Sequence, residues 1–352
     1  MIIGIEATKA FEREKTGVGW YTYYLIEEFR KIEREGVKLR LYVNPYSNIK
    51  YQISNIKFLK WPLKYFWTQG RLSLEMIANP PDVLFIPAHL PPLIHPKKLV
   101  VTIHDLAFKQ YPEVYSKKEL RLQEWGIQRV LRKAWRIITP SEFTKSEIQK
   151  YYPRLAKNNI FVVPHGVELK TQNHNVKLKT NIVYIGRLEA KKNIVNLIKS
   201  FNILKKNYSL ILIGPQGYGY RQIKKEILAS PYKNYIQELG WLPHEEVAKH
   251  LANARLFVFP SLYEGFGLPL LESFAAGTPA VCSDIPALKE VGGDCALYFN
   301  PRDPEDMAEK MRAMIQNSAL RSESIERGKT HAKLFSWQRT AEKTFVILKE
   351  GL

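Results

Sequence analysis

The sequence has little of what marks several common classes of protein. Its two cysteines, Cys282 and Cys295, are too few for a disulfide framework or a metal site, and they fit a reducing, cytoplasmic setting. No apolar run approaches the roughly 18 residues that a membrane-spanning helix needs. There is no G-x-x-x-x-G-K-[ST] loop, no Asp-x-Asp after a strand and no Cys/His ligand set. A P-loop nucleotide hydrolase is therefore excluded, and a metal-dependent mechanism has no visible support.

Length and charge set the remaining bounds. A chain of 352 residues is long for one core and predicts two domains. The opening stretch MIIGIEATKAF carries Glu6 and lacks a basic start, so we expect no signal peptide there. The net charge is +19, with 27 Lys and Arg against 15 Asp and Glu in residues 1–165 and 26 against 19 in residues 166–352. This excess favours an anionic partner, such as nucleic acid, an acidic membrane or a phosphorylated ligand. A solvated basic surface is the alternative.

Short apolar runs alternate with helical stretches along the whole chain. This alternation is typical of a parallel sheet with crossover helices. A first series runs from MIIGIEA to NIFVVPHGV, and a second starts at KTNIVYIGRL. Between them lies the polar stretch KTQNHNVKLKT, which we interpret as a linker. We therefore predict an α/β protein of two Rossmann-like, doubly wound units.

The predicted boundaries give two domains of similar size. Residues 1–165 form the first and residues 166–335 the second, and residues 336–352 form a terminal helical segment. Ligands of open parallel sheets bind beyond the carboxyl ends of the strands. We accordingly expect a binding cleft between two facing sheets.

A glycine-rich turn in the stretch EGFGLPLLE joins a predicted strand to a predicted helix. Gly265 and Gly267 let the backbone approach a ligand closely. The start of the helix would then present an anion site. Its amides belong to Phe266, Gly267 and Leu268.

Two acids flank this turn. Glu272, about one helical turn inside the helix, is placed to accept hydrogen bonds from a diol such as a ribose. Glu264, before the turn, could reach hydroxyls of a group that the phosphate carries. A plain strand–helix connection with capping acids is the alternative.

Two further turns follow predicted strands. In GRLEAKKN, residues 186–193, Arg187 and Lys192 could converge on a diphosphate, Arg as a fork and Lys as a point charge. In TGVGWY, residues 16–21, Gly17 and Gly19 could cradle a phosphate or a sugar. The dinucleotide fingerprint is incomplete there, because its third glycine is replaced by Thr22. A basic surface loop and an ordinary turn are the respective alternatives.

A histidine and an aspartate end a buried strand in VVTIHDLAF. His104 could donate a hydrogen bond to a substrate hydroxyl, with Asp105 beside it. A satisfied His–Asp pair in the core is the alternative. His165, in PHGV at the expected domain junction, is interpreted as structural.

Taken together, these motifs resemble the retaining GT-B glycosyltransferases of glycosyltransferase family 4, nearly from end to end. The resemblance is carried by EGFGLPLLE, the family's Glu-x7-Glu motif, and by GRLEAKKN, its phosphate grip. Other matching stretches are PAVCSDIPALKEVGGDCALYFNP, LGWLPHEEVAKHLANA, ITPSEFTKSEI and FSWQRTAEKT. The first half resembles the branch of bacterial polysaccharide and O-antigen mannosyltransferases. The stretches that carry this resemblance are TGVGWYTYYLIEEF, FWTQGRLS and VVTIHDLAFKQYPEVY.

The resemblance implies a role for each of these residues. The second domain would hold the nucleotide sugar and the first the acceptor, with a final helix from about Trp337 returning to the first. The donor would be bound by Arg187 and Lys192 at its diphosphate, Glu272 at its ribose, Trp241 and Leu242 at its base, and Phe266, Gly267 and Leu268 at its phosphate and sugar. Glu264 would hold the sugar. From the first domain, Gly17 and Gly19 would approach the diphosphate and His104 the sugar, with Asp105 less defined in role.

The reaction that this implies is transfer of a hexose with retention, without a metal or other cofactor. We expect mannose from GDP-mannose, passed to a glycan or a polyprenyl-diphosphate-linked acceptor in surface polysaccharide synthesis. Basic groups and the helix start would stabilise the departing nucleoside diphosphate. The alternatives are a UDP-sugar donor such as UDP-glucose, a nucleotide-sugar epimerase, and a basic nucleic-acid-binding protein. The last should show a basic recognition helix or stacked aromatics, and we find neither.

Two stretches of the first half combine basic and aromatic residues. KKELRLQEWGIQRVLRKAWR, residues 117–136, is a candidate basic helix, and WPLKYFW, residues 61–67, adds aromatics. We hypothesise peripheral contact with an anionic membrane at its inner face. Packing of both stretches on the sheet is the alternative.

Overall fold

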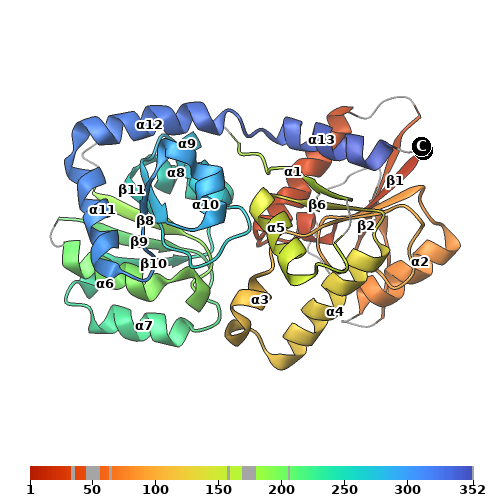
Figure 1. Ribbon diagram of the computed structural model, residues 1–352, viewed down its shortest axis with the longest axis horizontal. Helices are drawn as coiled ribbons and strands as arrows, with labels where there is room; N and C mark the ends of the chain where they lie inside the picture. The colour runs from red at the N-terminus through yellow and green to blue at the C-terminus, as the bar shows by residue number, and fades with distance from the viewer. Residues whose placement is uncertain are drawn as a thin grey trace. The chain divides into compact units, whose positions relative to one another are not determined.

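The computed structural model describes residues 1–32, 36–44, 56–62, 66–156, 159–168, 180–204 and 207–350 (Figure 1). The chain forms two compact units. The first unit comprises Met1–Leu106, Ser116–Gly166 and Trp337–Leu352. The second unit comprises Ala107–Tyr115 and Val167–Ser336. Most of the linker predicted in KTQNHNVKLKT lies outside the described residues.

The described part of the first unit contains a seven-stranded parallel sheet with the order β3-β2-β1-β4-β5-β6-β7. The order reverses between β1 and β4, which are paired although other strands separate them in sequence. The strands are β1 (Ile2–Glu6), β2 (Lys38–Val43), β3 (Ile56–Phe58), β4 (Val83–Ile86), β5 (Leu99–Thr102), β6 (Arg136–Thr139) and β7 (Ile160–Val162). β4 and β5 are buried along their whole length, as expected for central parallel strands.

Two helices of the first unit, α4 and α5, begin at side-chain caps. Ser141 Oγ accepts a hydrogen bond from the Thr144 amide at 3.0 Å, which confirms the predicted cap. Ser116 and Glu119 form a reciprocal capping box. The helices are α1 (Gly17–Ile32), α2 (Ser73–Ala78), α4 (Lys117–Lys133), α5 (Glu142–Tyr151) and α13 (Trp337–Lys349). The candidate helix over residues 117–136 was predicted too long, because Arg136 begins the buried strand β6.

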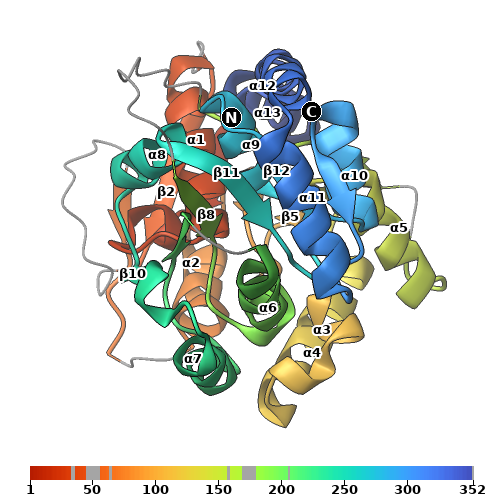
Figure 2. The same ribbon diagram turned by 90° about the vertical axis from the view of Figure 1, so that its left-hand side faces the viewer.

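The second unit contains, within its described residues, a six-stranded parallel sheet with the order β10-β9-β8-β11-β12-β13. Two doubly wound parallel sheets are therefore confirmed. The strands are β8 (Asn181–Ile185), β9 (Ser209–Ile213), β10 (Ile236–Gly240), β11 (Ala254–Phe259), β12 (Ala280–Ser283) and β13 (Leu297–Phe299). β8 and β11 are direct neighbours, and the strand order reverses between them (Figure 2).

Helices cover both faces of this second sheet. α6 and α7 lie on one face, and α8, α9 and α10 lie on the other (Figure 1). The helices of the unit are α3 (Ala107–Gln110), α6 (Ile194–Leu204), α7 (Tyr220–Ala229), α8 (His244–Ala252), α9 (Leu268–Ala275), α10 (Pro286–Gly292), α11 (Pro304–Gln316) and α12 (Ser318–Ala332). The short helix α3 comes from residues that we predicted in the first domain.

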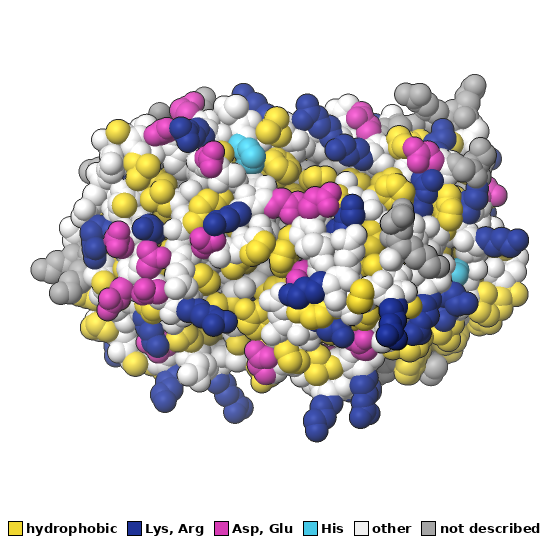
Figure 3. All heavy atoms as spheres, in the orientation of Figure 1, with side chains coloured by type: hydrophobic (Ala, Val, Ile, Leu, Met, Phe, Trp, Pro, Cys, Tyr) yellow, Lys and Arg dark blue, Asp and Glu magenta, His cyan; other side chains and the backbone are white. Residues whose placement is uncertain are grey.

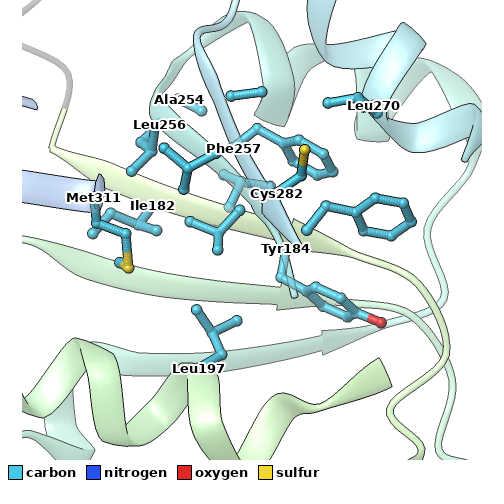
Figure 4. Close-up of a cluster of buried hydrophobic side chains, with 14 of the residues drawn as sticks. Ile182, Tyr184, Leu197, Ala254, Leu256, Phe257, Leu270, Cys282 and Met311 are labelled. Carbon is cyan, nitrogen blue, oxygen red and sulfur yellow. The ribbon is translucent and has the colours of Figure 1, made fainter. Parts of the chain in front are cut away.

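The core of the second unit surrounds β8 and β11. Ile182, Phe257 and Leu270 are fully buried there and contribute to one continuous apolar cluster (Figure 4). Cys282 lies in the same cluster, and burial raises the pKa of its thiol. Both cysteines are free and buried. They fill space in the core as small apolar side chains.

An aromatic cluster fixes α13 to the rest of the first unit. The Trp337 ring stacks on Tyr24 of α1, with ring centroids 4.9 Å apart and an interplanar angle of 15°. Thr340 Oγ1 donates a hydrogen bond to the Pro164 carbonyl at 2.8 Å. Arg136 Nη1 donates to the Ile347 carbonyl at 2.9 Å. The helix is thus attached to α1, to β6 and to the stretch after β7.

This packing predicts that Trp337→Ala destabilises the first unit. The side chain is only 6% exposed, so its removal should lower the free energy of unfolding by about 3 to 5 kcal/mol. Val346 lies on the same helix and is 51% exposed, so Val346→Ala should change that energy by less than about 0.5 kcal/mol. Urea unfolding followed by circular dichroism measures both. Equal effects of the two substitutions would contradict the docking of α13.

Candidate functional site

The strand order of the second unit reverses between β8 and β11, and this place is the topological switch point of the sheet. The connections that leave two such strands diverge to opposite faces, so their first residues are left around a common point at the carboxyl edge. The stretch after β8 contains Gly186, Arg187 and Lys192. The stretch after β11 contains Glu264 and leads into α9. Two of the predicted motifs therefore flank the switch point of one sheet.

An ion pair joins these two stretches. Lys192 Nζ lies 2.5 Å from Glu264 Oε1, and both side chains are mostly buried. Ser261 Oγ donates a second hydrogen bond to the same carboxylate oxygen at 2.7 Å. Lys192 Nζ also lies 5.9 Å from the centroid of the Phe259 ring. The sequence predicted each residue of this pair as a ligand contact, and the structure shows that they hold each other.

The start of α9 has the backbone that its sequence predicts. Gly267 occupies the N-terminal cap position with φ of 111°, a conformation that favours glycine. A Cβ at this position would lie 2.6 Å from Leu288 Cδ2. No side chain caps the helix start, and Leu268 is its first residue. The Phe266 side chain is buried and its ring lies 6.1 Å from that of Phe335, so only its backbone could serve a ligand.

Glu272 lies one turn inside α9 and is half-buried. Burial raises the pKa of its carboxyl group, and the nearby charge of His244 opposes this. His244 is the first residue of α8, directly after the stretch that holds Trp241 and Leu242. Leu242 packs against the core of the unit. The structure therefore brings Glu272 to the β10–α8 connection, where the base-binding residues were predicted.

Arg187 follows the turn at Gly186, whose φ is 147°. The Tyr184 hydroxyl donates a hydrogen bond to the Arg187 carbonyl at 3.1 Å and fixes the backbone there. A Cβ on Gly217 would lie 2.7 Å from Arg187 Cδ, so the side chain passes closely over Gly217. Arg187 is exposed and forms no ion pair with any residue that the structure describes. Its guanidinium group is accessible to an anion.

In the first unit, Gly17 and Gly19 begin α1, on the connection that leaves β1. A Cβ on Gly19 would lie 2.8 Å from the Lys9 carbonyl oxygen, whereas a Cβ on Gly17 would meet nothing within 4 Å. Glycine at position 19 is therefore required by the close approach of two backbone segments. Position 17 has space for a side chain.

His104 follows β5, and both of its ring nitrogens have partners within the first unit. Nε2 lies 2.8 Å from the Pro87 carbonyl oxygen and must donate to it. Nδ1 lies 3.3 Å from His165 Nε2 and accepts from it in the neutral tautomer. Burial lowers the pKa of His104 from its ordinary 6.5 to about 4, while the Pro87 bond and Asp105 oppose the shift.

The sequence did not reveal that His165 is the hydrogen-bond partner of His104. It lies 61 positions from His104, and no local pattern in PHGV marks the pairing. Its ring also lies 4.5 Å from that of Tyr21, which is fully buried. A substrate hydroxyl that bonded His104 would have to replace one of these two partners. Donation by His104 to a substrate stays a prediction.

The comparisons with known proteins agree with this arrangement. A family model described as Glycosyltransferase Family 4 matches residues 15–171, and one described as Glycosyl transferases group 1 matches residues 168–331. The O-antigen chain mannosyltransferase B of Escherichia coli is 32% identical over 268 residues, which cover 72% of this chain and 70% of the relative. The chain belongs to glycosyltransferase family 4.

Two further similarities extend this result. An O-antigen chain mannosyltransferase of Salmonella typhimurium is 23% identical over 75% of this chain and 72% of its own. The solved structure of a sucrose-phosphate synthase from Thermosynechococcus elongatus matches with a TM-score of 0.81 at 18% identity, over 98% of this chain and 97% of the other. The fold of this glycosyltransferase is GT-B.

Within the glycosyltransferase, the described residues hold no group of three His, Cys, Asp or Glu side chains arranged to bind a metal ion. None of the described helices has the length and apolar character required to cross a bilayer. Metal independence of the reaction stays a prediction.

The buried environment of His104 predicts that this ring stays neutral between about pH 8 and about pH 5. An unfolded imidazole binds a proton near pH 6.5 and the folded ring only near pH 4. The stability that this group contributes is therefore complete above pH 6.5 and is lost as the pH falls toward 4. Nitrogen-15 spectra of the histidine rings, assigned with His104→Gln, measure the titration. A midpoint near the ordinary value would contradict the burial.

Proposed function

We propose that this glycosyltransferase moves mannose from GDP-mannose onto a glycan or lipid-linked saccharide, with retention and without a metal, in surface polysaccharide synthesis. The single observation that carries the site is the convergence of Lys192, Glu264 and the Gly267 turn at one switch point. The choice of mannose is supported by the two O-antigen mannosyltransferases that resemble the chain.

The second unit would bind the donor, and each part of the nucleotide sugar has a matching group there. Arg187 is accessible and offers a forked pair of donors to the diphosphate. Glu272 accepts hydrogen bonds from the ribose hydroxyls, and Trp241 and Leu242 lie against the base. Among the described residues, no cation lies at bonding distance from Glu272, so its carboxylate oxygens are available to hydroxyl donors.

The ion pair between Lys192 and Glu264 gives the donor its two remaining contacts. A phosphate would draw the ammonium group of Lys192, and a sugar hydroxyl would donate to the carboxylate of Glu264. Because the two charges already neutralise each other, neither is left unpaired before the donor arrives. When the bond to the anomeric carbon breaks, Lys192, Arg187 and the start of α9 stabilise the charge on the departing phosphate. The acceptor oxygen would form the new bond to the anomeric carbon on the same face of the sugar, and the departing phosphate would accept the proton of that hydroxyl.

The first unit would bind the acceptor. Gly17 is exposed at the start of α1 and Gly19 is buried there, and His104 and Asp105 follow a central strand at the same edge of their sheet. His104 stays neutral near pH 7, so its role would be to orient a hydroxyl through a hydrogen bond and not to carry charge.

The first prediction from this function concerns the donor. The wild-type protein should bind and slowly hydrolyse GDP-mannose in preference to UDP- and ADP-sugars, with EDTA present. Glu272→Ala should weaken donor binding by about ten- to hundred-fold, as expected for lost hydrogen bonds to a charged group. Isothermal titration and product analysis measure binding and hydrolysis.

Glu326→Ala is the matched control for this variant. Glu326 is an exposed carboxylate of α12 in the same unit, and its loss should leave donor binding unchanged. Selective turnover of a UDP-sugar would retain the transferase and replace the donor. Loss of activity in EDTA would contradict metal independence, and absence of binding to every donor would contradict the proposed function.

We also propose that the first unit contacts an anionic membrane. The exposed side of α4 carries the cations Lys118, Arg121 and Arg132 together with Leu122 and Trp125, which are 46% and 39% exposed. The opposite side, with Ile127 and Val130, is buried, so part of this helix packs on the unit as the alternative expected. Figure 3 shows Lys and Arg side chains interspersed with hydrophobic ones in the region of α2 and α4.

The second aromatic stretch contributes less to this surface. Residues 63–65 of WPLKYFW lie outside the described residues. Trp67 is buried, and its Nε1 donates a hydrogen bond to the Leu59 carbonyl at 2.9 Å. Phe66, by contrast, is 71% exposed. A mixed cationic and apolar surface of this kind is suited to phospholipid headgroups.

This surface predicts binding to vesicles that contain phosphatidylglycerol and none to pure phosphatidylcholine. Replacing Leu122 and Trp125 by Ser should reduce sedimentation with the anionic vesicles, and so should replacing Arg121 and Arg132 by Glu. Leu228→Ser changes a leucine of α7 that is 61% exposed, and it should have no effect. Equal binding to both kinds of vesicle, or to neither, would contradict the proposal.

A further inference from the structure

A short segment from the middle of the first half of the chain belongs to the second unit. It comprises Ala107–Tyr115, and we call it the clamp segment. It contains α3 and a tight turn over Pro112–Val114. It begins two residues after Asp105, and the chain returns to the first unit at Ser116. Its side chains contact the two stretches that carry Lys192 and Glu264.

Tyr111 contacts the stretch after β11. Its hydroxyl donates a hydrogen bond to the Leu262 carbonyl at 3.2 Å. Its ring meets that of Tyr263 at an angle of 63°, with centroids 6.2 Å apart. Burial raises the pKa of Tyr111, so the hydroxyl stays protonated and keeps its role as a donor. Leu262 lies two residues before Glu264.

Tyr115 contacts the stretch after β8. Lys191 Nζ donates a hydrogen bond to the Tyr115 hydroxyl at 3.3 Å. The same ammonium group lies 5.7 Å from the centroid of the Tyr115 ring and 3.5 Å from Glu189 Oε1. Lys191 is the residue directly before Lys192. Each tyrosine of the clamp segment therefore holds one of the two stretches.

The two stretches are also joined directly to each other. The Leu262 amide donates a hydrogen bond to the Lys191 carbonyl at 2.9 Å. The two tyrosines thus bond to the two residues of this bridge, one to the carbonyl of Leu262 and the other to the side chain of Lys191. The ion pair between Lys192 and Glu264 lies immediately beyond it. Displacement of either tyrosine would remove one hydrogen bond to a residue of this bridge.

We propose that Tyr111 and Tyr115 are positioning residues for the donor. They hold the stretches after β8 and β11 in one arrangement. Lys192 and Glu264 are therefore already oriented when a nucleotide sugar binds. The inference rests on the proposed function, because it concerns the same site. Groups held in place before binding lose less conformational freedom when the ligand arrives, and binding is tighter as a result.

The experiment compares Tyr111→Phe, Tyr115→Phe and the double variant with the wild type. Each substitution removes one hydroxyl and keeps the ring, so packing is preserved. Tyr235→Phe is the matched control, because Tyr235 is a 54% exposed tyrosine of the same unit, before β10. Hydrogen exchange is measured without ligand in peptides covering residues 186–193 and 260–268. Binding of GDP and UDP is measured by titration calorimetry, and melting temperature by calorimetric scanning.

Each single variant should speed exchange in these two peptides and weaken nucleotide binding by about five-fold, the net effect of one hydrogen bond. The double variant should do more, and the melting temperature and exchange elsewhere should stay near those of the wild type. Faster exchange throughout the second unit would indicate a structural role and overturn the inference.

The remaining outcomes separate this inference from the function on which it rests. If the variants bind nucleotide as the wild type does and exchange is unchanged, the positioning role of Tyr111 and Tyr115 is wrong and the proposed function is unaffected. If the wild type binds neither GDP nor UDP, the proposed function fails, and the donor-positioning role fails with it. Weakened nucleotide binding with unchanged hydrogen exchange in both peptides would also contradict the positioning role of the two tyrosines.

Discussion

The pairing of β8 with β11 is the constraint on which the proposed donor site depends. These strands are hydrogen-bonded neighbours although β9 and β10 lie between them in sequence. Because their connections leave toward opposite faces, no helix fills the point where the two strands end. Within the second unit, the groups that we propose for the diphosphate, the ribose and the sugar of the donor follow these two strands. The Gly267 turn, the Lys192–Glu264 pair and Glu272 all lie on the connections that follow the two strands.

The energetics of the ion pair explain how charged groups can be kept there. A mostly buried carboxylate or ammonium group without a partner would lower the stability of the unit considerably. Mutual pairing of Lys192 and Glu264, with Ser261 as an additional donor, removes this penalty in the absence of ligand. The same pairing prevents the two stretches from separating. The Lys192–Glu264 contact thus neutralises both charges and also holds together the stretches after β8 and β11.

Much of the fold follows from the sequence, because parallel strands that are covered on both faces appear as short apolar runs. The central strands, the Ser141 cap and the glycine at position 267 were all predicted on physical grounds. β3 was not predicted, since a three-residue edge strand has too few residues to show a pattern. The clamp segment belongs to the second unit, where Tyr111 and Tyr115 contact residues more than 70 positions away, and no local pattern reveals these contacts. The residues of the site were named from the sequence, but the partnerships of Lys192 with Glu264 and of His104 with His165 join positions 72 and 61 residues apart.

The attachment of α13 to the first unit has a consequence for the order in which the protein is made. Residues of α13 are translated after the entire second unit, yet Trp337 and Thr340 complete the packing around Tyr24 and Pro164. Domains generally fold from the N-terminus as they leave the ribosome. Here the unit that starts first must wait with part of its apolar surface uncovered, while the second unit can finish folding once Ser336 has emerged. The N-terminal unit is therefore the one that completes its packing last during synthesis.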